Sequence, residues 1–276
     1  MKTKIFLNTY TVQKEWDDDP LRTLEFFHEA GYEGIEMQIN CDQPLFDKIL
    51  LKINSLGLNA VSAHINFTDA LERSDFYFNR MSALNIKNMV IPWLPEDCLP
   101  GGVHYSETKE KITALAELCK KNSASLAYHN HDFEFKKING VCKYDIFLQD
   151  ISVLDAQLDI CWCAVGGQNP AEYIRHYGHR MKTMHLKDFS LSRQVEGVKL
   201  FDLLGQGDAA EAQVKRKENG FAFRPIGMGK VDFVSIFKAA DETGICWAGV
   251  EQDESPDMPP MEAAKLSIDY IRKNWK

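Results

Sequence analysis

Short apolar runs alternate with amphipathic segments along nearly the whole chain. The apolar runs are bounded by polar residues or glycine, and this pattern is typical of buried strands in a parallel sheet. The eight strands that it predicts are Ile5–Tyr10, Gly34–Met37, Asn59–Ile65, Asn88–Trp93, Ser125–His129, Ala156–Cys161, Met181–Leu186 and Trp247–Val250.

In the segments between these runs, apolar residues recur every three or four positions, which predicts helices. Ser106 and Asp232 are the expected N-caps of two of them, and Gly31, Gly57 and Gly244 follow predicted helix ends. The predicted helices are Pro20–Ala30, Pro44–Leu56, Ala70–Leu84, Ser106–Lys121, Tyr144–Gln149, one that begins at Pro170, Phe233–Glu242 and Met261–Trp275.

Strands that alternate with helices, without a linker or a shift in composition, predict one α/β domain over residues 1–276. A doubly wound open sheet more often carries a glycine-rich phosphate-binding turn after its first strand, and this sequence has none there. We therefore expect a single (β/α)₈ TIM barrel with a long loop after the seventh strand.

That loop, Ser190–Gly229, is rich in Gly, Lys, Glu and Gln. Because it follows a strand, it belongs to the face that carries the active sites of TIM barrels, and we expect a lid or an oligomer contact. Its middle, Ala209–Asn219, is charged and poor in large apolar residues, so it should be mobile or held by another subunit of a homo-oligomer. The aromatic and basic return, Phe221–Pro225, contains Arg224, a candidate for contact with a ligand.

The bulk composition narrows the range of partners. The net charge of −8 disfavours a nucleic-acid partner, because phosphate binding calls for a basic surface. Seven cysteines, none of them in a CxxC pair, predict free and mostly buried thiols in a reducing compartment. The first residues lack the apolar core of a signal peptide, and no apolar stretch is long enough to span a bilayer, so we expect a cytoplasmic protein without a membrane partner.

Polar residues stand at the C-terminal end of nearly every predicted strand. A single polar residue at a strand end is unremarkable because strand ends are wet, but a full ring of them indicates an active site. The ring consists of Glu36, His64, Trp93, His129 with His131, Asp159, His185 with Lys187, and Glu251.

Three members of this ring, Asp159, His185 and Glu251, combine carboxylate and imidazole donors that suit one divalent metal ion. The candidates are Mn²⁺, Zn²⁺, Co²⁺, Mg²⁺ and Fe²⁺, acting as a Lewis acid on a carbonyl or a deprotonated alcohol. Lys187 lies two residues after His185 and points to the same side of the strand, where it could stabilise a developing enolate oxygen. The alternative for Lys187 is a salt bridge at the barrel rim.

Several motifs together resemble a known superfamily, and they extend over essentially the whole chain. They are Gly34-Ile35-Glu36, Ser62-Ala63-His64, Tyr128-His129-Asn130-His131-Asp132-Phe133-Glu134-Phe135, Leu158-Asp159, His185-Leu186-Lys187-Asp188, Gly227-Met228-Gly229-Lys230-Val231-Asp232 and Glu251-Gln252-Asp253. With these motifs the chain resembles the xylose-isomerase-like (β/α)₈ superfamily of sugar-phosphate isomerases and epimerases, which also holds inosose dehydratases and AP-endonuclease type 2 proteins.

The resemblance implies a metal held by a Glu on the fifth strand and by Asp, His and Glu on the next three. The last three match Asp159, His185 and Glu251, but His129 stands where the glutamate is usual. Either His129 binds the metal, or a neighbour such as His131 or Glu134 does, or solvent fills that position. Met228 is a second departure, since a Gly-Glu-Gly sequence is common there.

The reaction that we expect from the resemblance is isomerisation or epimerisation of a sugar or keto-sugar, by proton transfer through an enediolate. The alternative is an inosose-dehydratase-like or keto-sugar lyase, and the less favoured readings are a non-catalytic sugar-binding barrel and an AP endonuclease. The candidate catalytic residues are His129, His131, Lys187 and Glu251. The candidate substrate-binding residues are Glu36, His64, Trp93, Asn130, Trp162 and Arg224.

Overall fold

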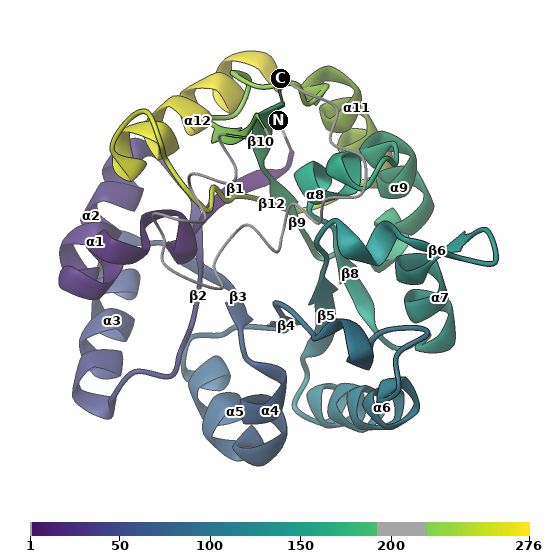
Figure 1. Cartoon of the computed structure of the whole chain (residues 1–276). Helices are drawn as coiled ribbons and strands as arrows, with labels where there is room; N and C mark the ends of the chain where they lie inside the picture. Colours follow the sequence, from purple (N-terminus) through teal and green to yellow (C-terminus); the bar gives the residue numbers. More distant parts are fainter. Residues whose placement is uncertain (1, 192–217, 219) are drawn as a thin grey trace.

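The computed structural model describes residues 2–191, 218 and 220–276 (Figure 1). Its main sheet has eight parallel strands in the order β8-β5-β4-β3-β2-β1-β12-β9. Isolated bridges between Ala156 and Met181 and between Asp159 and His185 join β8 to the β9 side, so the sheet closes into a barrel. The strands are β1 Lys4–Asn8, β2 Gly34–Met37, β3 Asn59–His64, β4 Asn88–Ile91, β5 Ser125–His129, β8 Asp155–Gln157, β9 Thr183–Leu186 and β12 Trp247–Val250.

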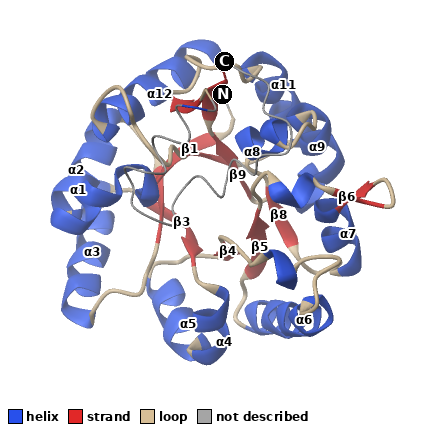
Figure 2. Cartoon of the chain, viewed as in Figure 1, coloured by secondary structure: helices blue, strands red, loops and turns tan. Residues whose placement is uncertain are grey.

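Helices surround the barrel and cover its outer face (Figure 2). Their apolar stripes pack on the strands, and α2, α3 and α11 each begin at an aspartate N-cap and end at a glycine. The Asp19 and Asp232 side chains each accept a backbone hydrogen bond as N-caps, and Gly31 ends a helix at φ 96°, where a side chain would be strained. The helices are α1 Gln13–Asp18, α2 Pro20–Ala30, α3 Gln43–Leu56, α4 Phe67–Glu72, α5 Ser74–Ala83, α6 Tyr105–Lys121, α7 Lys143–Asp150, α8 Ile160–Val165, α9 Pro170–Tyr177, α11 Phe233–Thr243 and α12 Pro260–Asn274.

The predicted strand Ala156–Cys161 is wrong in its second half. β8 ends at Gln157, and Asp159 is the N-cap of helix α8, its Oδ1 accepting a hydrogen bond from the backbone N–H of Trp162. Cys161 and Cys163 therefore lie on a helix and not on a strand. A short apolar run does not distinguish a strand from a buried helix, and the capping aspartate decides between them here.

Other boundaries also differ from the prediction, most of them by one or two residues. The predicted helix Ala70–Leu84 is two helices, because the backbone leaves helical geometry at Arg73. The first strand stops at Asn8, whose side chain caps a 3₁₀ turn. Ser106 is not an N-cap, since α6 begins one residue earlier and follows His104, which makes no side-chain cap.

The insertion after the seventh barrel strand is ordered at both ends. β10 (Asp188–Leu191) and β11 (Phe221–Arg224) pair antiparallel as a ribbon beside the barrel mouth. Most of the predicted long loop, and nearly all of its middle, Ala209–Asn219, lies outside the described residues. A second, shorter hairpin, β6 (Lys137–Ile138) with β7 (Val141–Cys142), follows β5.

Apolar side chains fill the space between the sheet and the helices, as expected for this fold. The seven cysteines are free, and four of them are buried. In the described part of the chain, no helix combines the length and the apolar character needed to cross a membrane.

Candidate metal centre

Side chains from four neighbouring strand ends meet at the C-terminal mouth of the barrel. His129 ends β5, Asp159 follows β8, His185 lies in β9 and Glu251 follows β12. One donor atom from each of the four lies within 4.8 Å of the others, and all four residues are buried. A cluster of two imidazoles and two carboxylates at this spacing could hold a divalent metal ion.

The first carboxylate, that of Asp159, is rigidly placed. Its backbone N–H donates to Oδ1 of Asn130 at 3.0 Å, and Nδ2 of Asn130 donates to its carbonyl at 3.2 Å. Its Oδ1 is used in capping α8. The remaining oxygen, Oδ2, has no hydrogen-bond partner in the part of the chain that the structure describes, and it faces His129 and Lys187.

The ring of His129 presents its second nitrogen to the same point. Nδ1 lies 3.2 Å from the carbonyl oxygen of Pro92, which can only accept, so Nδ1 carries a proton. Nε2 lies 3.5 Å from both Asp159 Oδ2 and Glu251 Oε2, without a hydrogen bond to any described residue. In the neutral ring this nitrogen is a lone-pair donor directed at the cluster.

His185 is held between two carboxylates. Nδ1 lies 3.0 Å from Glu251 Oε2, inside the cluster, and Nε2 lies 2.6 Å from Glu36 Oε1, behind it. Glu36 is completely buried and also accepts hydrogen bonds from Asn8 (2.8 Å) and from Gln157 (2.6 Å). The glutamate therefore orients the imidazole from below, as carboxylates commonly do for metal-binding histidines.

Lys187 is the buried cation of the cluster. Its Nζ lies 2.7 Å from Glu251 Oε2, 3.1 Å from Asp159 Oδ2 and 2.8 Å from Asp253 Oδ1. Burial lowers the pKa of a lysine, but the three carboxylates outweigh that effect and hold the pKa of Lys187 well above its usual range. The rim salt bridge considered above does not describe this residue, because Lys187 is only 1% exposed.

The same charges shift the neighbouring groups. Burial opposes ionisation of Glu251, yet the cations Lys187 and His185 hold its pKa well below the usual range. Burial also opposes protonation of His185, but the charges of Glu251 and Glu36 raise its pKa to about 10. Asp159 and Glu251 likewise outweigh burial and raise the pKa of His129, so the carboxylates favour positive charge at both histidine positions.

These features fit a divalent cation. The carboxylates of Glu36, Asp159, Glu251 and Asp253 outnumber the single lysine among them, so a bound cation would help to balance their negative charge. Within the cluster, His129 Nε2 and Asp159 Oδ2 are buried without a hydrogen bond to any residue that the structure describes, and they lie 3.5 Å apart. Lys187 contacts the same carboxylates, Asp159 and Glu251, that would hold such a cation.

A second layer of polar and aromatic groups borders the cluster. The ring of His131 stacks on Phe133, and its centroid lies 5.1 Å from that of His129. Burial and the neighbouring cations keep the pKa of His131 well below its usual range, so its ring is neutral. Glu134 accepts hydrogen bonds from the Tyr128 hydroxyl at 2.6 Å and from the His131 N–H at 2.9 Å, and burial raises its pKa to about 7.

Aromatic residues of the ribbon close one side of the mouth. Trp162 is completely buried, stacks on Phe221 with the rings 10° apart and meets Phe223 edge-on. Nζ of Lys187 lies 5.5 Å from the Trp162 ring and 5.6 Å from the Phe223 ring. The ribbon therefore contributes a wall of the site through its apolar residues.

The remaining predicted substrate-binding residues lie at different depths. His64 stacks on His185 and contacts Gln157 at 2.9 Å, and Trp93 has a buried indole Nε1 without a hydrogen-bond partner among the described residues. Asn130 instead braces the Asp159 backbone. Arg224 pairs with Asp257 in the loop after β12, at the outer edge of the ribbon.

Two residues of the site were missed by the sequence reasoning. Gln157 is fully buried and bonded to Glu36, and Asp253 contacts Lys187. Asp253 was visible within the Glu-Gln-Asp motif, and Gln157 precedes Asp159 by two positions, the spacing that places two strand residues on one face. No signal for their partners existed, since each partner comes from a distant strand.

The family model for the xylose isomerase-like TIM barrel matches residues 24–274. The chain belongs to this family. It is 27% identical over 187 residues to an inosose dehydratase of Clostridium botulinum, a match that covers 63% of this chain and 57% of that protein. The chain thus spans little more than half the length of the curated relatives that it matches.

Solved structures confirm the barrel. A sugar phosphate isomerase/epimerase from Parabacteroides distasonis superposes with a TM-score of 0.73 at 20% identity, covering 98% of both chains. A probable 3-DHS dehydratase from Bacillus anthracis superposes with a TM-score of 0.71 at 13% identity, covering 99% of this chain and all of the other. At these identities the likeness establishes the fold and leaves the reaction open.

Proposed function

We propose that this protein is a divalent-metal-dependent isomerase or epimerase of a sugar or keto-sugar. The observation that carries the proposal is the convergence of His129, Asp159, His185 and Glu251 within 4.8 Å at the barrel mouth. The proposal is also supported by similar solved structures, which include sugar phosphate isomerase/epimerases and an L-ribulose 3-epimerase. The proposed substrate is a small molecule, and its reacting carbon lies beside a ketone.

The four clustered residues would hold the ion, and His129 takes the place of a glutamate in this proposal. A bound divalent ion supplies Lewis acidity toward a carbonyl or alkoxide oxygen. Lys187, held by Asp159, Glu251 and Asp253, directs a fixed positive charge at the same position and stabilises negative charge that develops on the substrate oxygen.

Proton transfer falls to the histidine and glutamate side chains at the mouth. Glu251, which is ionised, and His131, whose ring is neutral, are the candidates for carrying the proton to and from carbon. Trp162 and the ribbon aromatics Phe221 and Phe223 exclude water from this side of the site. Trp93 offers an indole N–H to a substrate hydroxyl.

The test is proton exchange on a panel of keto-sugars and inososes in D₂O, with the metal-loaded and the chelator-treated protein compared by NMR. Metal-dependent incorporation of deuterium at a carbon beside the ketone, with all substrate atoms retained, is the expected result. Exchange that is equal with and without chelator, or absent from the whole panel, would contradict the proposal.

A second candidate is a lyase that removes water from the same kind of substrate. Two observations favour it: the curated relatives are inosose dehydratases, and one of the two glutamates that serve as acid and base in related epimerases is replaced by His129. Dehydration needs one base for carbon and one acid for the leaving hydroxyl, and the protonated Lys187 could supply the acid. In the D₂O experiment, a product that has lost water relative to the substrate would indicate a lyase.

A further inference from the structure

A file of buried polar side chains runs through the barrel interior below the metal centre. Glu36, which holds His185, accepts a hydrogen bond from Gln157 Nε2 at 2.6 Å. Gln157 Nε2 also donates to Thr183 Oγ1 at 2.9 Å, and Asn88 Nδ2 donates to the same oxygen at 3.1 Å. Barrel interiors are usually filled by layers of branched apolar residues, so a continuous polar file is a costly feature that calls for a reason.

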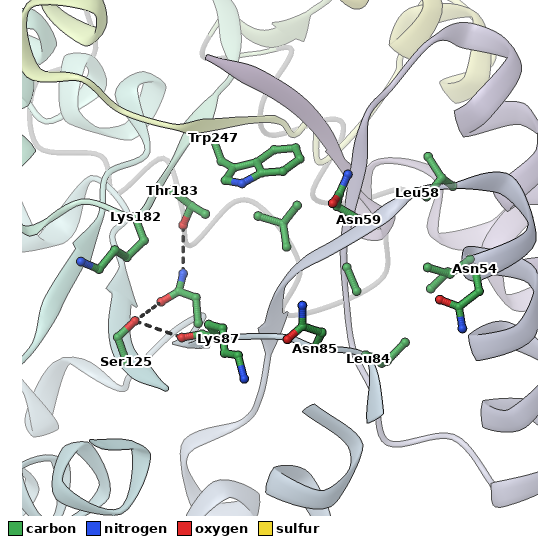
Figure 3. Close-up of a pocket in the computed structure, with 14 residues that line it drawn as sticks. Asn54, Leu58, Asn59, Leu84, Asn85, Lys87, Ser125, Lys182, Thr183 and Trp247 are labelled. Carbon is green, nitrogen blue, oxygen red and sulfur yellow. Dashed lines mark hydrogen bonds between the residues drawn. The ribbon is translucent and has the colours of Figure 1, made fainter. Parts of the chain in front are cut away.

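The lower end of this file opens into a cavity. The cavity has a volume of about 480 Å³ and lies at the opposite mouth of the barrel, where the strands begin (Figure 3). Asn88 and Thr183 line it, and Ser125 donates to Asn88 Oδ1 at 3.0 Å from its wall. Its lining includes the first residues of five strands, Asn59, Asn88, Ser125, Thr183 and Trp247.

The lining has the composition of a site for a small polar anion. The charged residues that line it are Lys87 and Lys182, and no carboxylate is among its lining residues. Asp155 interacts with Lys182 electrostatically but does not line the cavity. The lining also contains the carboxamides of Asn54, Asn59, Asn85 and Asn88.

An aromatic wall completes the cavity. The indole of Trp247 lines it (Figure 3). Nζ of Lys4 lies 5.4 Å from the centroid of this ring. Lysines attract an anionic group, carboxamides pair with hydroxyls, and an aromatic face packs against C–H groups. The volume lies within the range of small-molecule sites.

We propose that this cavity binds a small polyhydroxylated anion, a sugar phosphate or a sugar carboxylate, and that its occupancy changes the affinity of the upper centre for its metal ion. The first half stands on the cavity alone, whereas the second half rests on the proposed function. A hydroxyl or anionic oxygen that bonds to Asn88 or Ser125 competes with the hydrogen bonds of the file. The change passes through Thr183 and Gln157 to Glu36, which orients His185.

Coupling of this kind must be reciprocal, because both ligands bias the same hydrogen-bonded side chains. The anion in the cavity therefore changes the metal affinity of the upper centre by a certain factor, and the metal ion changes the anion affinity of the cavity by the same factor. Among the described residues, the two halves of the file meet at Thr183 Oγ1, so a substitution of Thr183 can separate them.

Binding is tested first, on the full-length metal-free protein, by calorimetry and tryptophan fluorescence. Glucose 6-phosphate and gluconate are titrated separately to distinguish phosphate from carboxylate, with glucose and inorganic phosphate as partial ligands. We expect one of the two anionic sugars to bind with a Kd below about 1 mM and at least about tenfold more tightly than either partial ligand. Equal affinity for inorganic phosphate, or no binding by either anionic sugar, would overturn the site.

Variants then locate the binding. The double variant Lys87→Ala/Lys182→Ala should weaken it at least about tenfold, whereas the double variant Lys238→Ala/Lys265→Ala, on the exposed faces of α11 and α12, should not change it. Trp247→Phe should remove the fluorescence change while calorimetric binding remains. Unchanged affinity in the first variant would place the anion elsewhere and refute the cavity as its site.

Coupling is measured as the Mn²⁺ affinity with and without the saturating anion. In Thr183→Val the Mn²⁺ affinity should no longer depend on the anion, and Thr183→Ser should restore the dependence. If Mn²⁺ does not bind at all, the proposed function fails while the cavity stands. If both ligands bind and neither changes the other's affinity in the wild-type protein, the coupling is refuted.

Discussion

Nε2 of His185 lies 2.6 Å from Oε1 of Glu36, on the opposite edge of the ring from Glu251. This contact decides how the imidazole enters the cluster, because a proton held between Nε2 and Glu36 leaves Nδ1 free to bind a metal ion. Glu36 was predicted to bind substrate, and its complete burial beneath His185 makes it a positioning residue in our proposal.

Glu36→Gln tests this role. The amide can still accept a hydrogen bond from His185, but it lacks the charge that makes the ring a better donor, so we expect metal affinity to fall about 10- to 100-fold. The measurement is a competition titration of Mn²⁺ or Zn²⁺ against a chelating dye. Glu262→Gln, on the exposed face of α12, is the matched control, and equal affinity in the two variants would remove Glu36 from the centre.

His129→Ala tests the fifth-strand position. Since Nε2 of His129 faces both Asp159 and Glu251, we expect lower metal occupancy together with a turnover at least about 100-fold lower. Occupancy is measured by metal analysis after gel filtration, and His28→Ala on the surface of α2 serves as the control. Full occupancy with lost turnover would make His129 a proton shuttle, and no change in either would exclude it from the site.

Lys187→Met tests the charge balance of the cluster. Removing one cation from three carboxylates should destabilise the metal-free protein by about 3 kcal/mol, because their buried charges lose their partner. Added Mn²⁺ should then stabilise the variant more than the wild type. Urea unfolding with metal and with chelator measures both, and Lys238→Met provides the exposed control. An equal metal effect in wild type and variant would argue against a shared position for ion and lysine.

Glu134 predicts a pH dependence of stability. Burial raises its pKa from 4.5 to about 7, so the protonated form is favoured in the folded state. The contribution of this group to the free energy of unfolding is fully present below about pH 4.5 and is lost as the pH rises through about 7. The loss amounts to about 3 kcal/mol.

The measurement for Glu134 is the free energy of unfolding between pH 5 and pH 8 with chelator present. Glu134→Gln keeps a neutral group of the same shape beside Tyr128 and the His131 N–H. Relative to the wild type, the variant should therefore lose less stability as the pH rises. Parallel pH profiles of the two proteins would show that Glu134 does not titrate in this range.

Arg224 tests the ribbon. It pairs with Asp257, which ties β11 to the loop after the strand that leads to Glu251. We expect Arg224→Ala to raise KM or lower kcat, and Asp257→Asn to have the same direction of effect if the pair acts by holding the ribbon. A defect in Arg224→Ala alone would instead indicate contact between the guanidinium and the substrate. Unchanged kinetics in both variants would exclude the ribbon from a role in closing the mouth.

The pattern of apolar and polar positions was sufficient for the barrel. Parallel strands buried on both faces must be continuously apolar, and the helices that cover them must be amphipathic, so local sequence carries the architecture. The pattern gave the wrong structure for the second half of Ala156–Cys161, because a short apolar run fits a strand and a buried helix equally well. The hydrogen bond from the Trp162 N–H to the Asp159 side chain begins a helix there.

The ring of strand-end residues also followed from sequence, since parallel strands place all their C-terminal ends at one mouth. What each residue does there depended on tertiary structure. Glu36 and Asn130 look equivalent to His64 and Trp93 along the chain, yet the barrel turns Glu36 beneath His185 and Asn130 toward the Asp159 backbone. Strand order and register set these contacts between residues up to 149 positions apart, and no local pattern encodes them.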